Sequence, residues 1–400
     1  MWQLLERASR DVFEGFGYEE IRTPILEEAA LFQKGVGEGT DIVNKEMYTL
    51  TDKGGRSLAL RPEGTAPIVR SYIENRLGAD DLAKLYYLGP MFRSERPQKG
   101  RSRQFHQIGV EAIGSFSAYL DVEIIVMMRA LFKRLTLDEF KIKLCTLGCD
   151  KDKAKLAKEL RAFLEPEKNR LCDDCKIRLK KNVLRTLDCK VESCRVVLRN
   201  SPKAKDFLCP SCTEHYDKLK AMLSSLKIDF KEDPNMVRGL DYYTRTVFEV
   251  THPSLGAQDA VAAGGRYDNL VGDFGGARVG AAGFAIGAER LIMALSAEKN
   301  IGLQDKMLDL YAATAGPAAR DEAFKSVIAL RRQGIYCEMN MRDKSLKAQM
   351  REANRKKAAF TAIFGEEELG RGEVVLRSMK TSEQRNVKLS DLAKEVRKGL

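Results

Sequence analysis

The sequence predicts an α+β protein built around an antiparallel sheet with flanking helices, interrupted by a helical insertion and followed by a C-terminal α/β domain. Between residues 47 and 114, short runs with alternating apolar residues follow one another with turns between them, as in antiparallel sheets. A lysine-rich, cysteine-bearing stretch of helical character over about 150–230 interrupts the strands. After about residue 303, strand-like and helix-like segments alternate, which is typical of a parallel α/β domain.

The chain begins with an expected helix and strand. Apolar residues recur at helical spacing over 1–14, and Gly15 and Gly17 are expected to end that helix. The run IRTPIL (21–26) is strand-like, but Pro24 has no N–H to donate, so this strand is predicted at a sheet edge or a bulge. Such an edge beside a long helix is either a dimer surface or a plain surface strand.

The remaining elements follow in order. Strands are expected over 47–52, 57–63, 84–95, 105–114, 141–148, 237–252 and 260–271, with a helix over 121–135. The segment GFAIGAERLIMAL (283–295) is expected to be a helix, and strands at 308–315, 334–340, 360–365 and 373–379 alternate with helices at 318–333 and 344–357 before a terminal helix. We therefore expect four segments: 1–149, 150–230, 231–303 and 304–400.

Composition narrows the class of protein. Hydrophobic content of 44% and charged content of 31% are ordinary for a soluble globular protein. No run of 18 apolar residues exists, and the amphipathic start is unlike a secretory signal, so a cytoplasmic location without a membrane is expected. The net charge of +11 suits a polyanionic partner, although a merely soluble basic surface has the same charge.

The usual phosphate-binding loops are absent, but arginines gather on strands. There is no GxxxxGK[ST] and no GxGxxG between a strand and a helix. The stretch FRSERPQKGRSRQFHQ (92–107) instead carries four arginines, whose guanidinium forks suit phosphate oxygens. Arg93 and Glu95 are two apart and share one strand face, and Phe105 could offer an aromatic face to a base. A solvated charged hairpin is the alternative.

Two further arginines stand in apolar or glycine-rich surroundings. Arg238 precedes GLDYY, and Arg290 lies early in an apolar helix-like segment. A charge in such surroundings is costly unless it is paired or meets a ligand. For Arg290, a salt bridge or a surface position is the alternative.

These segments, in this order, resemble the class II aminoacyl-tRNA synthetases, and specifically the histidyl-tRNA synthetase family, over essentially the whole chain. GFGYEEIRTPILEE resembles class motif 1, GPMFRSERPQKGRSRQFHQIGVE motif 2 and GFAIGAERLIMAL motif 3. RGLDYYTRTVFEV and AAGGRYDNLV resemble the two histidine-specific peptides of the family.

The resemblance implies an enzyme, a ligase of protein biosynthesis. It implies a class II catalytic sheet in a homodimer joined through motif 1, and a C-terminal domain that reads the anticodon. The implied reaction uses ATP, with Mg²⁺, and L-histidine to form histidyl-adenylate and pyrophosphate, and then charges tRNA(His). The inserted domain is implied to touch the acceptor arm of the tRNA.

The resemblance also implies roles for single residues. Arg93 and Arg238 would hold the α-phosphate and the histidine carboxylate, with Arg238 acting where other class members use a metal ion. Arg290 and Arg101 would hold the γ-phosphate and the departing pyrophosphate. Glu95 would accept from the adenine amino group, between Phe105 and Arg290 on either side of the ring.

A second implied set selects histidine. Glu111 and Tyr243 would hydrogen-bond the imidazole nitrogens, with Tyr242 and Tyr267 in the same pocket. The implied contacts of the amino group are Glu63, Thr65 and Gln107. Without this context, the tyrosines would read as ordinary core residues. His106, His215 and His252 are interpreted as packed or surface residues and not as catalytic bases.

Six cysteines cluster within the insertion. CxxC pairs in a cytosolic protein suggest a metal before a disulfide, and two pairs match structural zinc spacing. The preferred zinc ligands are Cys172, Cys175, Cys209 and Cys212, with Cys189 and Cys194 as alternates for one pair and His215 as a spare. The family does not require a metal there, so six reduced thiols are the alternative.

Three expectations concern the rest of the chain. The short strand segment with which the family usually begins is missing before MWQLLER, which puts the activity of this version in doubt. Near the C-terminus, Lys344, Lys347, Arg351 and Arg355 follow helical spacing and form either a tRNA-contacting face or a solvated one. The closest rival class is a non-catalytic paralogue, such as the regulatory subunit of ATP phosphoribosyltransferase or a tRNA-sensing module, which usually loses motif residues or the C-terminal domain.

Overall fold

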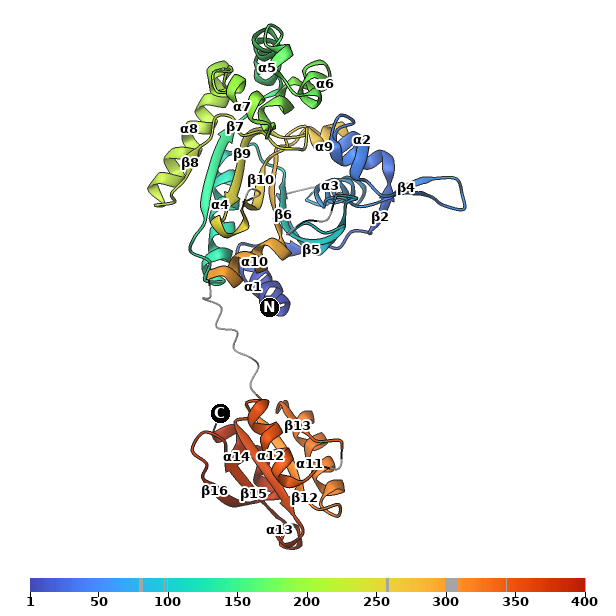
Figure 1. Ribbon diagram of the computed structural model, residues 1–400, viewed down its shortest axis with the longest axis vertical. Coiled ribbons are helices and arrows are strands. Elements are labelled where there is room, and N and C mark those ends of the chain that lie inside the picture. The colour runs from blue at the N-terminus through green and yellow to red at the C-terminus, as the bar shows by residue number, and fades with distance from the viewer. Residues whose placement is uncertain are drawn as a thin grey trace. The chain divides into compact units, whose positions relative to one another are not determined.

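The computed structural model divides into two compact units, residues 1–301 and 302–400 (Figure 1). It describes residues 1–78, 82–96, 98, 100–256, 259–298, 308–342 and 344–399. The expected boundary at 303/304 lies outside these described residues, and the four-segment division stays a prediction. Among the described residues, no helix is long and apolar enough to cross a membrane.

The first unit is built on an eight-stranded sheet in the order β1-β5-β6-β11-β10-β9-β7-β8. The strands are β1 (Glu19–Glu20), β5 (Ala83–Phe92), β6 (Gln104–Ile113), β7 (Lys141–Thr146), β8 (Lys231–Glu232), β9 (Thr244–Thr251), β10 (Ala260–Arg266) and β11 (Ala281–Gly287). Every neighbouring pair is antiparallel except the two edge pairs, β1–β5 and β7–β8. The expected antiparallel sheet is therefore confirmed.

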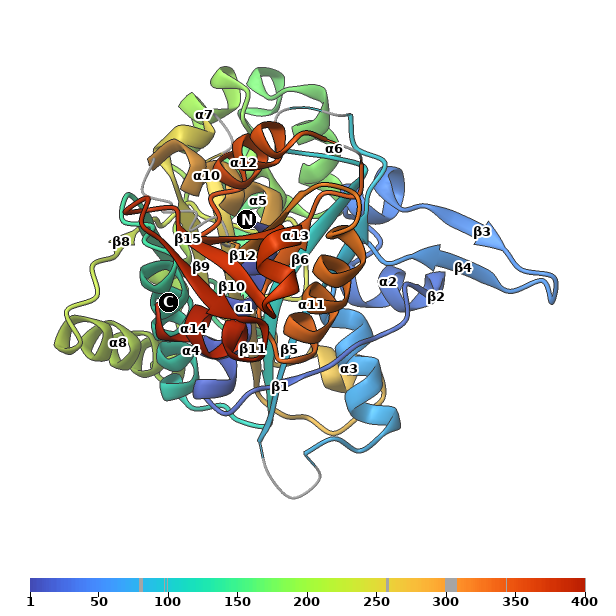
Figure 2. The same ribbon diagram turned by 90° about the horizontal axis from the view of Figure 1, so that it is seen from below.

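The two faces of this sheet pack against different elements. One face packs a large apolar core against α1 (Trp2–Gly15), α4 (Ala118–Arg134), α8 (Pro210–Ser225) and α10 (Ala288–Glu298). Figures 1 and 2 show these helices beside the sheet. The other face carries a second cluster that includes Tyr87, Tyr243 and Tyr267, near α3 (Thr65–Glu74) and α9 (Leu270–Asp273). Because side chains alternate along a strand, the same strands supply a closed core on one side and polar groups on the other.

A small sheet with the order β2-β4-β3 stands beside the large one. It consists of β2 (Leu26–Glu28), β3 (Thr49–Thr51) and β4 (Ser57–Leu60), with α2 (Ala29–Val36) and a π-helical turn at Ile42–Glu46 nearby. The run IRTPIL is not one strand: it bridges β1, at the edge of the large sheet, and β2 in the small one. Pro24 lies in that bridge, where no ladder hydrogen bond is needed.

Several expected elements need correction. The expected strand 84–95 ends at Phe92, so Arg93 and Glu95 lie beyond it, and the expected strand 260–271 ends at Arg266, with residues 270–271 in α9. In GFAIGAERLIMAL, the first five residues belong to β11, because Gly283–Gly287 pair with β6, and the helix begins only at Ala288. Of residues 237–252, only Thr244–Thr251 form a strand, and 238–243 form a loop. Alanine and glycine give β11 no apolar–polar alternation, which explains the difference at 283–287.

The insertion consists of α5 (Asp150–Leu164), α6 (Asp173–Lys181), α7 (Glu192–Leu198) and α8, joined by 3₁₀ turns at Lys168–Arg170, Val183–Asp188 and Ala204–Phe207. It is fixed to loops of the part of the first unit that carries the eight-stranded sheet. Arg185 Nη2 lies 3.1 Å from an Asp41 oxygen, and Asn182 donates to Asp241 at 3.0 Å. The inserted helices thus border the loop that carries Arg238.

The second unit is a five-stranded sheet in the order β13-β12-β14-β15-β16. Its strands are β12 (Leu310–Ala315), β13 (Cys337–Met339), β14 (Phe360–Gly365), β15 (Glu373–Ser378) and β16 (Gln384–Lys388). Its helices are α11 (Arg320–Arg332), α12 (Leu346–Arg355), α13 (Glu366–Gly370) and α14 (Leu392–Lys398). The first three strands are parallel, as expected, whereas β14, β15 and β16 pair antiparallel, and β16 was not expected.

Candidate active site

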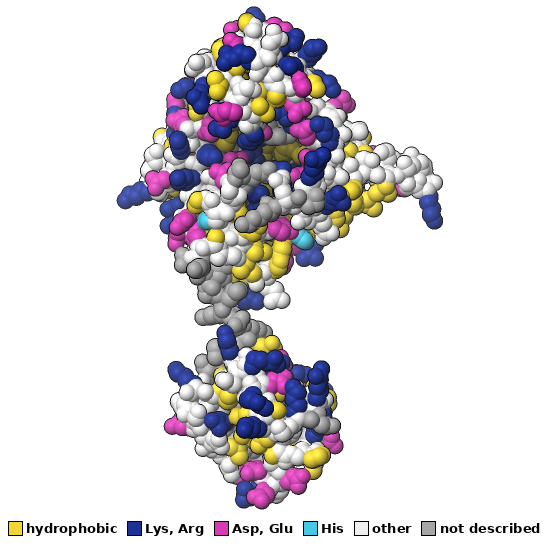
Figure 3. All heavy atoms as spheres, viewed as in Figure 1, with side chains coloured by type: hydrophobic (Ala, Val, Ile, Leu, Met, Phe, Trp, Pro, Cys, Tyr) yellow, Lys and Arg dark blue, Asp and Glu magenta, His cyan; other side chains and the backbone are white. Residues whose placement is uncertain are grey.

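A cavity of about 1160 Å³ lies in the first unit, and Figure 3 shows this unit hollowed on the face in view. All of the residues expected to bind ATP and histidine line it: Glu63, Thr65, Arg93, Glu95, Arg101, Phe105, Gln107, Glu111, Arg238, Tyr242, Tyr243, Tyr267 and Arg290. They come from five separate stretches of the chain, 63–65, 93–111, 238–243, 267 and 290. The structure therefore brings the whole expected set together, and the role of each residue stays a prediction.

Strand β6 contributes side chains along the length of the cavity. Phe105, Gln107 and Glu111 occupy odd positions and line the cavity, whereas Ile108 and Val110 point into the core on the other face. This is the period-2 alternation of a strand. The strand is held on both sides, by β5 and by β11, so its side chains have a fixed spacing.

Glu111 is the most deeply buried acid of the site, with 1% exposure. Its two carboxylate oxygens accept from Thr65 Oγ1 at 2.6 Å and from the Tyr267 hydroxyl. Burial raises the pKa of Glu111 to about 8, against the two hydrogen bonds, which lower it. Gly283 stands opposite in register, and any side chain there would collide with this carboxylate.

Glu63 organises the loop before α3. Its carboxylate accepts from the backbone N–H groups of Thr65 at 2.7 Å and Ala66 at 2.9 Å, so it satisfies the first free donors of the helix. Burial raises the pKa of Glu63, again against these hydrogen bonds. By fixing Thr65, Glu63 also positions the hydroxyl that donates to Glu111.

Three tyrosine rings form the apolar wall of this end of the cavity. The ring centroids of Tyr242 and Tyr243 are 4.8 Å apart, and those of Tyr242 and Tyr267 are 5.7 Å apart. All three side chains are buried, and burial raises the pKa of each hydroxyl. They therefore stay neutral, as donors or acceptors, across the physiological range.

The arginines form the charged part of the cavity. Arg93 Nε donates to the Pro62 carbonyl at 2.9 Å, and the guanidinium carbon lies 5.2 Å from the centroid of the Phe105 ring. Arg238 is ion-paired with Glu249, while its Nε is buried without a hydrogen-bond partner among the described residues. An unpaired buried donor in a cavity is costly in the empty protein and favours an anionic ligand.

At the other end, Arg101 Nη1 lies 2.7 Å from Glu95, and Arg290 Nε donates to the Ala260 carbonyl at 2.6 Å. Burial and the nearby Arg101 charge lower the pKa of Arg290, which still stays far above neutrality. The positive charges of Arg101 and Arg290 are close enough to repel each other, and an anionic ligand bound beside them would relieve this repulsion.

Several lining residues were not expected from the sequence. Glu249 and Lys143 are opposite each other on β9 and β7 and are 3.8 Å apart. Asp188, Lys190, Arg195 and Arg199 of the insertion also line the cavity. The signal for Glu249 was its polar odd position between apolar residues in TVFEVT; the sequence holds no comparable signal for the insertion residues.

The three histidines lie outside this cavity. His106 contacts Glu289 at 2.9 Å and packs against Trp2, on the opposite face of β6 from Phe105. His215 pairs with the buried Asp121 at 3.3 Å, and His252 with Glu298 at 2.8 Å. This agrees with their interpretation as packed residues.

The cysteines form two groups, and the grouping differs from the preferred one. Cys172 and Cys175 lie with the alternates Cys189 and Cys194, whereas Cys209 and Cys212 lie with Cys149 and Asp152. The expected quartet of 172, 175, 209 and 212 is thus not brought together, and neither group includes His215. CxxC spacing identifies pairs, but which pairs meet depends on the packing of the helices between them.

A largely antiparallel sheet, with a cavity that gathers arginines from three distant stretches, is the arrangement of a class II aminoacyl-tRNA synthetase. Family models agree with it: residues 2–291 match "Histidyl-tRNA synthetase" and residues 309–399 match "Anticodon binding domain".

Individual relatives extend the likeness over nearly the whole chain. The histidine–tRNA ligase of Halothermothrix orenii is 46% identical over 399 residues, which cover 99% of this chain and 95% of that protein. That of Thermosipho melanesiensis is 47% identical, over 96% and 91% of the two chains. The apo structure of S. aureus histidyl-tRNA synthetase has a TM-score of 0.83 at 34% identity, over 99% and 95%. The chain belongs to the histidyl-tRNA synthetase family.

Proposed function

We propose that the protein joins L-histidine to tRNA(His) at the expense of ATP, through a histidyl-adenylate. The convergence of Arg93, Arg238 and Arg290 on one cavity, beside a buried carboxylate ringed by tyrosines, carries the proposal. Family membership and the presence of the anticodon-binding match favour it over a non-catalytic paralogue.

In the first step, a carboxylate oxygen of histidine attacks the α-phosphorus of ATP. The bond from that phosphorus to the bridging oxygen of the β-phosphate breaks, and pyrophosphate leaves with the electron pair. Such a transfer depends on positioning and charge neutralisation. Arg93 and Arg238 hold the α-phosphate and the attacking carboxylate. Removal of either guanidinium is expected to cost about 3 kcal/mol of transition-state stabilisation.

The nucleotide lies along the Phe105 end of the cavity. The adenine ring stacks between Phe105 and the Arg290 guanidinium, while Glu95 accepts from its amino group. Glu95 and Arg101 are ion-paired in the empty protein, so ATP has to separate them: Glu95 then faces the base, and Arg101 the phosphates. Mg²⁺, when bound with ATP, would supply further charge neutralisation. The cavity offers oxygen donors such as Asp259, which suit this ion.

The histidine side chain occupies the tyrosine end. Glu111 and Tyr243 hydrogen-bond the two imidazole nitrogens, and Glu63, Thr65 and Gln107 surround the amino group. An amino acid without ring nitrogens leaves buried polar groups unpaired, and such sites reject it strongly.

In the second step, a hydroxyl of the terminal ribose of tRNA attacks the carbonyl carbon of the adenylate, and AMP leaves. The second unit binds the anticodon region, and the insertion approaches the acceptor arm. A zinc ion held by the insertion would be structural and would take no part in the ligation.

A homodimer is part of the proposal. Trp2, Leu4, Ile25 and Leu26 are large apolar residues with 40–45% exposure on α1 and around β2. They flank the edge strand β1, and exposed apolar groups beside a sheet edge favour a protein interface.

Histidine-dependent exchange of labelled pyrophosphate into ATP tests the first step without tRNA. We expect exchange with wild-type protein, and an about 100-fold loss of kcat/KM for histidine in Glu111→Gln, since a hydrogen bond to a charged group is worth up to about 3 kcal/mol. Glu123→Gln is the matched control, because Glu123 is half-buried by Tyr18 and Lys84, outside the cavity. No exchange with the wild-type chain, or exchange that does not require histidine, contradicts the proposal.

A further inference from the structure

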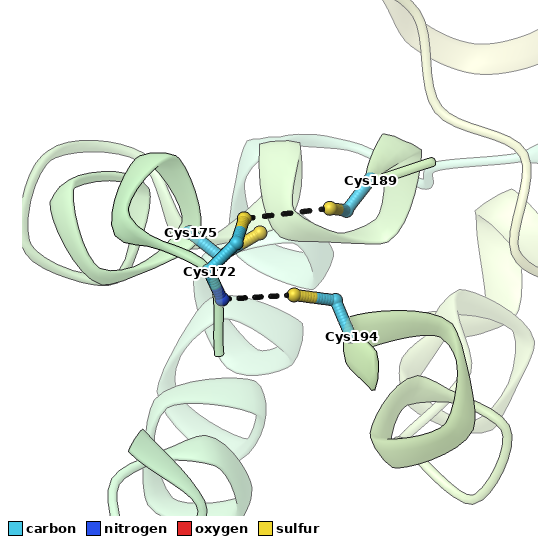
Figure 4. A group of neighbouring side chains, drawn as sticks. All are labelled: Cys172, Cys175, Cys189 and Cys194. Carbon is cyan, nitrogen blue, oxygen red and sulfur yellow. Dashed lines mark hydrogen bonds between the residues drawn. The ribbon is translucent and has the colours of Figure 1, made fainter. Parts of the chain in front are cut away.

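We propose that the insertion holds a structural zinc ion on Cys172, Cys175, Cys189 and Cys194, and that this ion fixes the wall of the insertion that faces the reaction cavity. Figure 4 shows the four side chains converging from three short segments. Cys172 precedes α6, Cys175 lies within it, Cys189 follows the 3₁₀ turn Val183–Asp188, and Cys194 lies in α7.

The sulfur geometry fits a tetrahedral ion. Four sulfurs at about 2.3 Å from zinc are about 3.8 Å from one another. The Sγ atoms of Cys172 and Cys189 are 3.8 Å apart, and all four Sγ atoms lie within 4.8 Å of one another. The backbone N–H of Cys172 donates to Cys194 Sγ at 3.1 Å, a contact that suits a thiolate better than a thiol.

The surroundings fit a metal as well. Cys175 and Cys194 have 0% exposure, and Cys189 has 7%, so the ion would be shielded from water. Four thiolates and Zn²⁺ leave two negative charges. Lys176, Lys190 and Arg195 each directly follow one ligand in the sequence, so three positive groups lie near that charge, although each is also ion-paired with a neighbouring acid.

The alternative is a core of four reduced thiols, each acting as a small apolar group. Against it stands the small size of the local core. The helices α6 and α7 have nine and seven residues, which is too short for stability on their own, and the cysteines themselves make up three of the ten buried core residues. Small domains of this kind commonly depend on a metal.

The second cysteine group is less suited to zinc. Both oxygens of Asp152 already accept backbone N–H groups, from Cys209 at 3.0 Å and from Cys149 at 3.3 Å. There the carboxylate caps α5 and the start of α8, so these residues have a structural role without an ion. The proposal therefore concerns the four-cysteine group alone.

The four-cysteine group lies beside the reaction cavity, so a bound zinc ion would also affect the wall of that cavity. The proposed ligand Cys189 lines the reaction cavity, and so do Lys190 and Arg195, each of which follows a ligand in the sequence. Zinc would tie the segment 187–199 to α6, which is anchored to the catalytic part through Arg178 and Asp41. Apart from its cysteines, this segment contributes Val197 and Leu198 to the buried local core.

The test compares the zinc content of full-length wild-type protein with that of two double variants, C189S/C194S and C209S/C212S. We expect C189S/C194S to hold one equivalent less than wild type. The matched pair C209S/C212S should keep at least one equivalent, and its zinc X-ray absorption should show four sulfur ligands. Wild-type protein with less than about a tenth of an equivalent, or C189S/C194S with the wild-type content, overturns the proposal.

A second measurement does not depend on variants. Chelation of the wild-type metal should speed tryptic cleavage within 172–199 by about tenfold or more, because cleavage follows the population of the opened segment. The rest of the first unit should be cut no faster. Unchanged cleavage of 172–199 after complete metal removal would falsify the role of the ion in holding this wall. Neither measurement uses histidine or ATP, so the result is independent of the proposed ligation.

Discussion

Burial and hydrogen bonding shift the pKa of the Glu111 carboxyl group in opposite directions. Thr65 and Tyr267 donate to it and favour its ionised form, but the loss of water raises its pKa to about 8. Burial thus favours the protonated form of Glu111 more than it would for a surface glutamate. A polar ligand that donates to this carboxylate would replace part of the missing hydration.

This balance predicts how stability depends on pH. The folded pKa of Glu111 lies above its ordinary value of 4.5, so the folded state binds the proton more tightly than the unfolded state does. The stabilisation is fully present below pH 4.5 and is lost as pH rises toward about 8. In Glu111→Gln, the fall in the free energy of unfolding between pH 5 and 8 should be shallower than in wild type. Urea denaturation without ligands at several pH values measures this free energy. The same pH dependence in wild type and Glu111→Gln would refute the raised pKa of Glu111.

At the scale of elements, the order of the strands explains how distant residues meet. β6 and β11 are neighbours, so motif 2 and motif 3 residues share one cavity although about 180 residues separate them. The antiparallel register also sets Gly283 against Glu111 and leaves room for its carboxylate.

Gly283→Ala should therefore damage the site without touching a ligand directly. A Cβ there would lie well inside 3.0 Å of both Glu111 Oε2 and the Val110 carbonyl. We expect the free energy of unfolding to fall by about 1–3 kcal/mol and KM for histidine to rise, because Glu111 must move. Gly272→Ala is the control, since nothing lies within 4 Å of a Cβ at that position. Equal changes in the free energy of unfolding and in KM for the two variants would show that a Cβ at position 283 does not displace Glu111.

The sequence predicted these elements unevenly. Strands with clear alternation, such as 105–114, were placed well, whereas the roles of Gln107 and Glu111 on that strand came only from the family resemblance. Residues 283–287 were expected to be helical, because alanine and glycine give a strand no apolar–polar alternation. The pairing of the cysteines was not predictable either, since it depends on how α6, α7 and α8 pack. Arg238 and Arg290 were singled out because a charge among apolar neighbours requires a partner, and Arg93 and Arg101 because a strand hairpin carries several guanidinium groups.

At the scale of the whole molecule, charge and apolar surface are distributed over different regions. In the second unit, Lys347 and Arg351 are exposed on α12, together with Lys344 and Arg355 at its ends. In the first unit, exposed apolar residues lie around α1 and β2. The former suits a polyanion and the latter a second protein surface.

The α12 face predicts a salt-dependent contact with tRNA. Lys347→Ala/Arg351→Ala should weaken tRNA binding and lower the slope of log K against log salt by about 1–2, as for the loss of two phosphate contacts. Pyrophosphate exchange should be unchanged. Lys325→Ala on α11 is the control, because this exposed lysine pairs only weakly with Glu322, at 3.5 Å. A filter-binding series in which both variants lower the slope equally would point to net charge and not to this face.

The apolar surface predicts an oligomer. Sedimentation of the wild-type chain should give a dimer, and Ile25→Asp/Leu26→Asp should shift it toward the monomer, because two buried charges would lack partners. Phe324→Asp, an exposed apolar site of 46% exposure on α11, should leave the mass unchanged. A monomeric wild type at micromolar concentration would exclude the proposed interface.

The position of Phe105 and Glu111 on one strand sets the length of what the cavity can hold. Six residues of strand span about 20 Å, so the aromatic platform and the buried acid have a separation that neither can change alone. A one-residue deletion between them would turn every later side chain to the opposite face, while substitutions would keep the spacing. This stretch should therefore tolerate changes of side chain but not changes of length.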